Sequence, residues 1–305
     1  MKKLALCAIV LAAACAPDTK NLEKKVDELA KNQQKMLDMM NSGKFAAGNA
    51  PGAQAPQRPQ RPQPDAQKTY AMPVDGDPMD GPADAKVTLV KAYDYACPYC
   101  QRVGDTMEQL RKKYGNDLRI VYKQFVVHPQ VATAGALAAC AANKQGKFTQ
   151  MDQLLWDKGF KGRSFDKDAA TPGENGSTKC WDSAAGCPVV TGFAQEIGLN
   201  VDKFKADMKG DCQGLIQKDM KELQQLGVAA TPSFFVNGRF LSGAMPIDNF
   251  STLIDEELKK ANERVQSGTP AASYYQTWVL EKGLKSLEAP APTPAAGQPI
   301  KLEKR

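Results

Sequence analysis

The stretch that decides the fold covers residues 87–100 and reads VTLVKAYDYACPYC. It opens with four β-branched or aliphatic residues, Val87–Val90, which predict a buried strand. It ends with two cysteines three positions apart, Cys97 and Cys100. Pro98 between them suits the first position of a helix, because its missing N–H would be unpaired there. We therefore expect a strand that leads directly into a helix beginning at a cysteine pair.

Two cysteines at this spacing are able to close an exchangeable disulfide across the first turn of a helix. The partial positive charge at a helix N-terminus favours the thiolate of Cys97 and lowers its pKa. Exchange passes through a mixed disulfide, with Cys97 as an accessible nucleophile and Cys100 as the resolving thiol. Zinc sites also use this spacing, so the pair alone does not decide between redox chemistry and metal binding.

A second element, the Ala-Thr-Pro-Ser stretch at 230–233, favours redox chemistry. A cis Pro232 suits a tight approach before a strand. A cis proline here leaves the backbone of Thr231 free to pair with an extended substrate peptide. The same proline keeps metal ions away from the thiols. Directly after it, strands over 233–236 and 239–241 flank an Asn-Gly dipeptide, the preferred two-residue turn of a hairpin.

The remaining patterns indicate an α/β domain with a helical insertion. Trp156 and Phe160 within the insertion are interpreted as core residues, or alternatively as hydrophobic side chains near a cleft that holds unfolded substrates. We assign the domain to 70–266. Its predicted elements are a strand over 87–90, a helix over 98–114, a strand over 118–125, a helical block over about 130–226, the hairpin, and a last helix over 246–262.

The chain begins with MKKLALCAIVLAAAC, which has the charged start and short apolar run of a secretory signal peptide over 1–14. The residues before Cys15 are typical of a bacterial lipoprotein, so we expect lipid attachment at Cys15. The alternative is cleavage before an unmodified Cys15. Either outcome places the protein in the bacterial cell envelope, on the periplasmic side, where disulfides persist. No apolar run reaches the roughly 20 residues of a membrane helix.

Residues 18–42 carry apolar side chains at alternating four- and three-residue spacings, with Gln33 as a polar exception. This pattern predicts a lipid-anchored helix over 15–42 that self-associates as a coiled coil through 18–42. The alternatives are a solvated spacer or a helix lying on the membrane. A disordered linker rich in Pro and Gln follows over 43–69. At the other end, 267–305 reads as an extension with one short helix and a disordered tail.

Six of the eight cysteines remain after the signal peptide and Cys15 are set aside. An even number in an exported protein indicates three pairs. Cys180 and Cys187 flank a short loop, so a local bridge is expected; a second redox centre or a four-cysteine zinc site are the alternatives. The one histidine, His128, excludes a His-rich metal site and any triad that needs a second histidine. We expect no metal or cofactor, and the mild positive charge predicts no nucleic-acid partner.

Residues 70–265 resemble the DsbA branch of the thioredoxin superfamily, especially its exported or lipid-anchored forms. The resemblance rests on three stretches, DGDPMDGPADAKVTLVKAYDYACPYC, HPQVATAGALAACAANKQGKF and GVAATPSFFVNGRFLSGA. It implies a thioredoxin fold with a helical insertion, and thiol–disulfide exchange as the activity. It also implies a site formed by Cys97, Cys100, Thr231 and cis-Pro232, with Pro98 and Tyr99 beside the substrate.

The chain departs from these relatives at two places. Lys91 stands where they usually carry a buried glutamate; its cation is expected either near Cys97 or turned out to solvent. Asp94 keeps the acid of the relatives. Tyr99 stands where the strongest oxidants carry histidine, so we expect a potential of about −150 to −230 mV.

The resemblance leaves two further assignments. His128 is interpreted either as a group near the active thiols or as a packed loop residue. Cysteines in the regions of Cys140 and Cys212 staple the helical domain in related proteins, so we expect a disulfide there, with buried free thiols as the alternative.

Three functions remain open. The first is an envelope thiol:disulfide oxidoreductase, as oxidase or isomerase, that acts on exported proteins with cysteines and exchanges electrons with a membrane redox partner. The second is a reductase charged by a membrane electron donor. The third is a non-enzymatic envelope tether whose domain only binds peptides. Because isomerases usually need several active sites held together, self-association through 18–42 makes isomerase activity a serious candidate.

Overall fold

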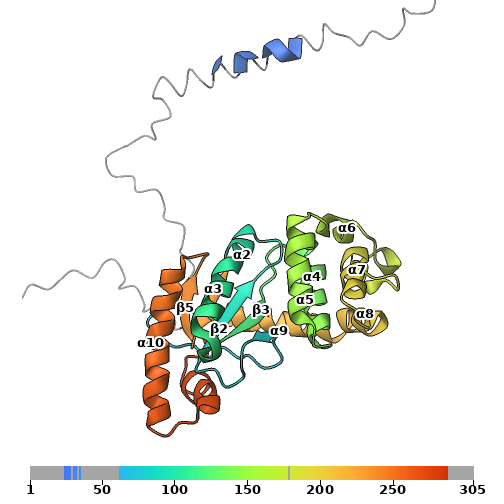
Figure 1. The fold of residues 1–305 in the computed structure, drawn as a ribbon. Coiled ribbons are helices and arrows are strands. Elements are labelled where there is room, and N and C mark those ends of the chain that lie inside the picture. The colour runs from blue at the N-terminus through green and yellow to red at the C-terminus, as the bar shows by residue number, and fades with distance from the viewer. Residues whose placement is uncertain (1–23, 29, 33, 36–61, 178, 288–305) are drawn as a thin grey trace, which may run out of the picture. The chain divides into compact units, whose positions relative to one another are not determined.

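The strand predicted over Val87–Val90 belongs to a five-stranded mixed sheet in the computed structural model of the chain (Figure 1). Its strands are β1 (Met79–Asp80), β2 (Val87–Tyr93), β3 (Leu118–Gln124), β4 (Ser233–Val236) and β5 (Arg239–Ser242). They lie in the order β1-β3-β2-β4-β5, so β2 is the central strand. β2 runs parallel to β3 and antiparallel to β4, and β4 pairs with β5 as the predicted hairpin.

The structure describes residues 24–28, 30–32, 34–35, 62–177 and 179–287, and the chain divides into two units, Met1–Gln60 and Arg61–Arg305. In the first unit the described residues are helical and exposed. The lipid-anchored helix over 15–42 and its self-association stay predictions. The predicted signal peptide, Cys15, most of the linker and the C-terminal tail lie outside the described residues.

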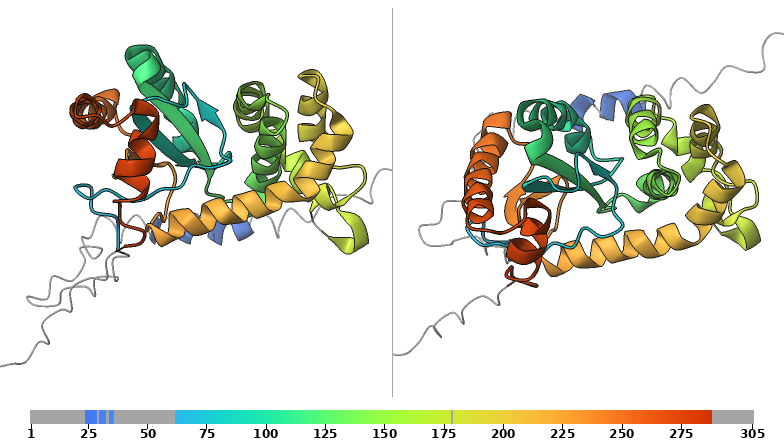
Figure 2. Two further views of the ribbon diagram at one scale, coloured as in Figure 1. Left: turned by 90° about the horizontal axis from the view of Figure 1, so that it is seen from below. Right: turned by 60° about the horizontal axis from the view of Figure 1, so that its bottom comes forward.

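Helices of the second unit surround the sheet and form a separate layer beside it (Figures 1 and 2). The insertion predicted over about 130–226 lies between β3 and β4. The α-helices are α2 (Pro98–Arg102), α3 (Gly104–Tyr114), α4 (Pro129–Asn143), α5 (Phe148–Leu154), α6 (Phe165–Ala169), α7 (Pro188–Glu196), α8 (Val201–Lys209), α9 (Asp211–Gln225) and α10 (Ile247–Gln266). Two π-helical segments are η2 (Leu155–Lys161) and η6 (Tyr275–Leu280).

The two faces of the sheet pack against different helices. Leu89 lies in one buried cluster with Leu110 of α3 and Phe250 of α10. The next residue along the strand, Val90, lies in a second cluster with Leu223 of α9 and Val279 of η6. Successive side chains of a strand point to opposite faces, and both faces are covered, so every residue of β2 is buried.

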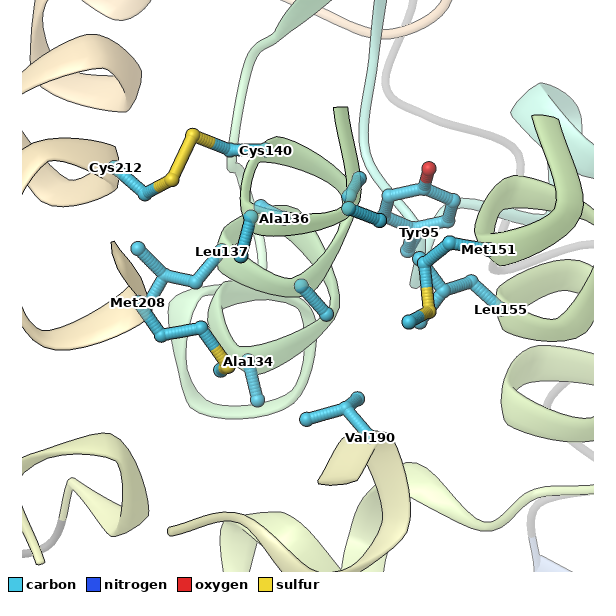
Figure 3. Packing of buried hydrophobic residues seen from close by; sticks show 14 of the residues in the cluster. Tyr95, Ala134, Ala136, Leu137, Cys140, Met151, Leu155, Val190, Met208 and Cys212 are labelled. Atoms are coloured by element: carbon cyan, nitrogen blue, oxygen red, sulfur yellow. A yellow bond between two sulfur atoms is a disulfide. The ribbon is translucent and has the colours of Figure 1, made fainter. Parts of the chain in front are cut away.

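The helical insertion is built around α4, which contacts α5, α6, α7, α8 and α9. Its sequence is rich in alanine, and these small side chains are buried on nearly all sides. Small residues allow neighbouring helices to approach closely, and a helix that is apolar all round is buried. Figure 3 shows Leu137 of α4 facing Met208 of α8, while Tyr95 lies toward Met151 and Leu155. The residues that follow β2 therefore pack against the insertion.

Helix α9 joins the insertion to the sheet (Figure 2). Near its start, Cys212 is bonded to Cys140 of α4. Past its middle, Asp219 accepts a hydrogen bond of 2.7 Å from Lys123 of β3, whose Nζ also lies 2.6 Å from Asp77 and 3.0 Å from Glu222. A buried ammonium with several carboxylate partners is a strong local tie. Helix α9 is thus bonded to α4 of the insertion near its start and to β3 of the sheet further along.

The helix predicted over 98–114 is broken into two, which corrects that prediction. The break falls at Val103, whose ψ of −5° turns the chain and whose N–H bonds to the carbonyl of Tyr99. The turn allows two neighbouring side chains to bury on different sides. Cys100 packs toward the insertion, and Val103 packs with α3 under the sheet.

The folded domain extends beyond the predicted boundaries of 70 and 266 at both ends. Before Tyr70, the carbonyl of Ala66 accepts a hydrogen bond from the side chain of Arg239. Thr69 forms an isolated antiparallel β-bridge with Arg239. Beyond Gln266, the helix predicted in the extension is found as η6, and the Tyr275 hydroxyl donates to the carbonyl of Met72. The extension contributes buried residues to the sheet cluster, so it is part of the core and not an appendage.

Candidate active site

The two cysteines of residues 97–100 lie where β2 meets the first helix after it. Cys97 is the N-cap of α2, with φ −87° and ψ 116°, and Pro98 occupies the first helical turn as predicted. Both cysteines carry free thiols. Cys97 is 4% exposed and Cys100 is fully buried, so the expected accessible sulfur at Cys97 is more covered than the sequence suggested. Packing against the insertion accounts for this cover.

The Thr-Pro stretch lies directly beside the first thiol. The peptide bond between Thr231 and Pro232 is cis, and the Cys97 Sγ–H donates to the carbonyl of Thr231 at 3.4 Å. The carbonyl of Pro232 accepts a hydrogen bond from Gly243, which holds the loop after β5 against it. Two segments separated by 134 residues therefore meet at one sulfur atom.

The two thiols have opposite electrostatic environments. The pKa of Cys97 is lowered from 9.0 to about 5, chiefly by a hydrogen bond from Cys100, with further hydrogen bonds from the side chain of Thr231 and from the backbone of Cys100 and Tyr99. Burial is the main reason that the pKa of Cys100 is raised above its usual range. A thiolate is the attacking species in exchange. Cys97 is thus suited to be the nucleophile, and Cys100 is suited to be the resolving thiol, which stays protonated until it reacts.

The lowered pKa of Cys97 gives a direct prediction for the reduced protein. Thiolate absorbance near 240 nm should rise with pH with a midpoint near pH 5, because Cys97 is protonated below its pKa and ionised above it. In the Cys100→Ala variant the main stabilising hydrogen bond is gone, so the midpoint should move upward by at least about one pH unit. A Cys97→Ala variant should lack this transition. A wild-type midpoint near pH 8.5 would contradict the environment described here.

Asp94 ties the cysteine loop to the loop before α4. Its buried carboxylate accepts N–H bonds from Ala96 at 2.6 Å, Val127 at 2.6 Å and His128 at 2.8 Å. The Nδ1 atom of His128 lies 3.2 Å from the same carboxylate, and half of the His128 side chain is exposed. The histidine is therefore a partner of the residue that shapes the active loop.

Lys91 is buried, which decides between the two positions expected for it. It is 3% exposed, so the alternative of a side chain turned out to solvent is wrong. Its Nζ lies 4.9 Å from the ring centre of Tyr93, 5.8 Å from that of Tyr122 and 5.6 Å from that of Trp156. Trp156 comes from η2 of the insertion and packs against the insertion core, as does Phe160. The sheet and the insertion together enclose this cation.

A hydrogen-bonded network near Lys91 was not predicted from the sequence. The Tyr95 hydroxyl donates to Asp152 at 2.6 Å and lies 3.0 Å from the Tyr93 hydroxyl, to which Gln124 donates at 2.6 Å. Alternation along β2 places Tyr93 and Lys91 on one face. Asp152 belongs to α5 and lies in no motif, so nothing in its local sequence indicates this position.

Three exposed apolar side chains lie on the active helix or on segments that are hydrogen-bonded to the active loops. Tyr99 is 54% exposed, Val127 39% and Met245 36%, and they belong to three different segments. Tyr99 follows Cys97 by two residues, Val127 bonds to Asp94, and Met245 lies in the loop that is held against Pro232. Exposed apolar groups at one place favour contact with another molecule.

The other four cysteines of the described domain form two disulfides. Cys140 is bonded to Cys212, and Cys180 is bonded to Cys187, at the pairings expected from the sequence. They are therefore neither buried free thiols nor ligands of a zinc ion. In the parts of the chain that the structure describes, no three His, Cys, Asp or Glu side chains are placed to hold a metal ion.

The sheet order, the cysteine pair at the start of α2 and the adjacent cis proline define a thioredoxin-type protein. A family model described as thioredoxin matches residues 74–256, and the chain belongs to this family. The predicted superfamily and the predicted thioredoxin fold with a helical insertion are confirmed.

Similar curated proteins carry the name of a membrane transporter. The chain is 31% identical over 169 residues to the Na⁺/H⁺ antiporter NhaA of Herminiimonas arsenicoxydans. The matched stretch is 55% of this chain and 23% of that protein. The chain is 30% identical over 200 residues to NhaA 3 of Salinispora tropica, covering 64% of this chain and 26% of that protein. The chain thus spans about a quarter of these relatives. Over the residues described, no helix has both the length and the apolar character needed to cross a bilayer.

Solved structures with a similar fold were also found. A thioredoxin-like oxidoreductase from Silicibacter pomeroyi DSS-3 is 24% identical with a TM-score of 0.43, covering 64% of this chain and 95% of that one. The catalytic domain of Proteus mirabilis ScsC is 21% identical with a TM-score of 0.47, covering 62% and 93%. Oxidised BdbD from Bacillus subtilis is 22% identical with a TM-score of 0.48, covering 65% and 100%.

Proposed function

We propose that this protein is an envelope thiol:disulfide oxidoreductase that forms or isomerises disulfides in exported proteins through Cys97 and Cys100. The single observation that carries the proposal is the thiol of Cys97 at the helix start, with its lowered pKa and its contact of 3.4 Å to the carbonyl of Thr231. A low thiol pKa at a helix N-terminus is typical of redox-active cysteines.

The opposite pKa shifts of the two thiols support a defined order of events. A substrate thiolate attacks the Cys97 sulfur of the Cys97–Cys100 disulfide, the S–S bond breaks, and its electron pair leaves on Cys100. A mixed disulfide now joins the substrate to Cys97. A second substrate thiolate displaces Cys97, which is the better leaving group because its pKa is the lower one. The substrate has lost two electrons, and a membrane redox partner must accept them from the reduced pair.

The surroundings of Cys97 favour a polypeptide substrate. The backbone of Thr231 lies at the sulfur, where an extended chain is able to pair with it. The exposed side chains of Tyr99, Val127 and Met245 offer apolar groups for such a substrate. Unfolded exported proteins present both extended backbone and apolar side chains, whereas a small thiol presents neither.

An envelope location is supported by the signal sequence and by two further disulfides in the folded domain, and a lipid anchor at Cys15 is supported by the residues that precede it. Disulfides persist in the oxidising compartments outside the cytoplasm. The heptad pattern over 18–42 supports a homo-oligomer. Several active sites on flexible linkers act on one substrate at high effective concentration, which favours the isomerase form of the activity.

Two assays on the full-length chain separate oxidase from isomerase. We expect it to refold scrambled ribonuclease and to oxidise a reduced dithiol peptide, and to be an oligomer by light scattering. A Val26→Asp/Leu29→Asp variant should become monomeric and lose at least about fivefold in isomerisation, because the effective concentration falls. Its peptide oxidation should stay within about twofold of wild type. A monomeric wild type would contradict the isomerase form, and failure in both assays would contradict the proposed function.

A further inference from the structure

The side chain of His128, the one histidine of the chain, makes neither of the contacts that are usual at its position. The residue is the N-cap of α4, but its side chain makes no capping hydrogen bond. Half of the side chain is exposed, and the buried apolar clusters of the described residues do not include it. Helix capping and core packing therefore do not explain how the imidazole is placed.

A buried carboxylate fixes the orientation of this imidazole. Asp94 is fully buried, and the Nδ1 atom of His128 lies 3.2 Å from its Oδ2 atom. An ionised carboxylate only accepts hydrogen bonds, so Nδ1 is the protonated nitrogen and Nε2 carries the free lone pair. Backbone N–H groups of Ala96, Val127 and His128 hold the carboxylate itself in place. An imidazole aligned in this way is prepared to accept a proton on Nε2.

Asp94 also holds the backbone next to the nucleophile. Its side chain accepts the N–H of Ala96 at 2.6 Å, and its carbonyl accepts the N–H of Cys97 at 3.1 Å. The loop of His128 and the loop of Cys97 are thus bonded to one residue and lie side by side. Val127, the neighbour of His128, is 39% exposed. A substrate that contacts Val127 while it reacts at Cys97 brings its own thiol to the side of the site where the imidazole lies.

The proposed exchange needs a base at this place. The attacking species is a thiolate, whereas an ordinary cysteine has a pKa of about 8.5 and is mostly protonated at pH 7. During the attack Cys97 and Cys100 are joined in their disulfide, so neither sulfur is able to take the proton. Histidine is the side chain that changes its protonation between pH 5 and pH 8.

The charged surroundings of the imidazole are simple. Over the described part of the chain, Asp94 is the charged side chain that lies within ion-pair distance of His128. Pro129 and Gln130, with which α4 begins, are neutral. Asp94 favours the protonated imidazole that forms when the base has accepted its proton, because opposite charges attract.

We propose that His128 is the general base of the exchange and that Asp94 orients it, an inference that rests on the proposed function. The substrate thiol gives its proton to Nε2 of His128, and the electron pair of its sulfur forms the bond to the Cys97 sulfur. The Cys97–Cys100 bond breaks, and its electron pair stays on Cys100. The imidazolium then gives its proton to Cys100 or to water, so the histidine is unchanged at the end of the step.

The test is the rate at which the oxidised full-length protein, present in excess, oxidises a dithiol peptide between pH 6 and pH 9.5. In His128→Gln we expect the rate at pH 7 to fall at least about tenfold, because a positioned base is lost. Above pH 9 the substrate thiol ionises without help, so the two rates should agree within about twofold. The variant keeps the backbone N–H of residue 128 on Asp94, so it should fold. Gln130→Ala, at an exposed neighbouring position, is the matched control and should behave as wild type.

Three further measurements separate a base from a structural or an electrostatic residue. The aromatic thiol 4-nitrothiophenol is already ionised at pH 7, so it should open the disulfides of wild type and His128→Gln at rates within about twofold of each other. A catalytic base changes rates and not equilibria, so the equilibrium constant of the variant with glutathione should stay within about twofold of wild type. His128→Lys supplies a positive charge, but its amine is protonated at pH 7, so this variant should be as slow as His128→Gln.

The outcomes distinguish this inference from the proposed function. If His128→Gln oxidises the peptide as fast as wild type at pH 7, His128 is not the base. A loss of equal size at every pH indicates a structural effect, and a rate that His128→Lys restores indicates a charge effect; either result contradicts the base. If the wild type does not oxidise the peptide at any pH, the proposed function fails instead.

Discussion

Replacing Cys97 with alanine will abolish thiol–disulfide exchange and leave the fold intact. We expect the rate of oxidation of a dithiol peptide to fall by more than about a thousandfold, since no other side chain can replace the nucleophile. The change removes one sulfur atom from a position that is 4% exposed, so the unfolding free energy should change by less than about 2 kcal/mol. Peptide fluorescence measures the rate, and urea unfolding measures the stability.

Cys100→Ala is the matched control for this experiment. It keeps the nucleophile and removes the thiol that resolves the intermediate, so mixed disulfides between Cys97 and substrate should accumulate. Mass spectrometry detects them as an adduct that a reductant removes. If exchange continues in Cys97→Ala, another group carries the activity. The same conclusion holds if Cys97→Ala and Cys100→Ala form equal amounts of the adduct.

Removing the disulfide between Cys140 and Cys212 should give the largest loss of stability among single changes to the insertion. The bond closes a loop with a sequence separation of 72, and the loss of its restraint on the unfolded chain corresponds to about 4 kcal/mol. It also joins α4, the centre of the insertion, to α9, which runs to the sheet. A Cys140→Ala/Cys212→Ala variant tests this by urea unfolding, with alkylation to confirm that the other bond is intact.

The second disulfide provides the comparison. Cys180 and Cys187 have a sequence separation of only 7, so their removal should cost about 2 kcal/mol. The Cys140/Cys212 variant should therefore unfold at clearly lower urea than the Cys180→Ala/Cys187→Ala variant. Equal losses, or a larger loss for the short loop, would contradict the view that Cys140–Cys212 is the main staple of the insertion.

The centre of the site could be predicted because its signals are local in the sequence. A run of strand-forming residues followed by Cys97 and Pro98 determines both the strand and the helix start, and Asn237-Gly238 determines the hairpin. The proximity of Thr231 to Cys97 depends on long-range folding. The Thr-Pro stretch by itself favoured redox chemistry, and the resemblance to the DsbA branch implied that it forms one site with Cys97.

Other parts of the site could not be predicted, because they depend on packing between layers. Alternation along β2 gives the face on which Lys91 lies. Whether that side chain is buried depends on Trp156, which arrives from the insertion. Asp152 lies on a short helix without any motif, and only the packing of α5 against Tyr95 brings it to the site.

The predicted domain was too short at both ends for a related reason. The residues before Tyr70 lie next to a Pro- and Gln-rich stretch, whose composition is typical of a linker. Their contacts with Arg239 are made by backbone groups, which composition does not show. In the same way Tyr275 and Val279 read as a short isolated helix, although they complete the core under one face of the sheet.

The reduction potential of the Cys97–Cys100 pair tests the central claim most directly. The full-length protein is equilibrated with glutathione buffers of different ratios, alkylated, and the thiols of the peptide containing residues 97–100 are counted by mass spectrometry. We predict a single two-electron transition in which both thiols disappear together, with a midpoint of about −150 to −230 mV. Thiols that stay reduced across the whole range, or that react independently of each other, would contradict the account.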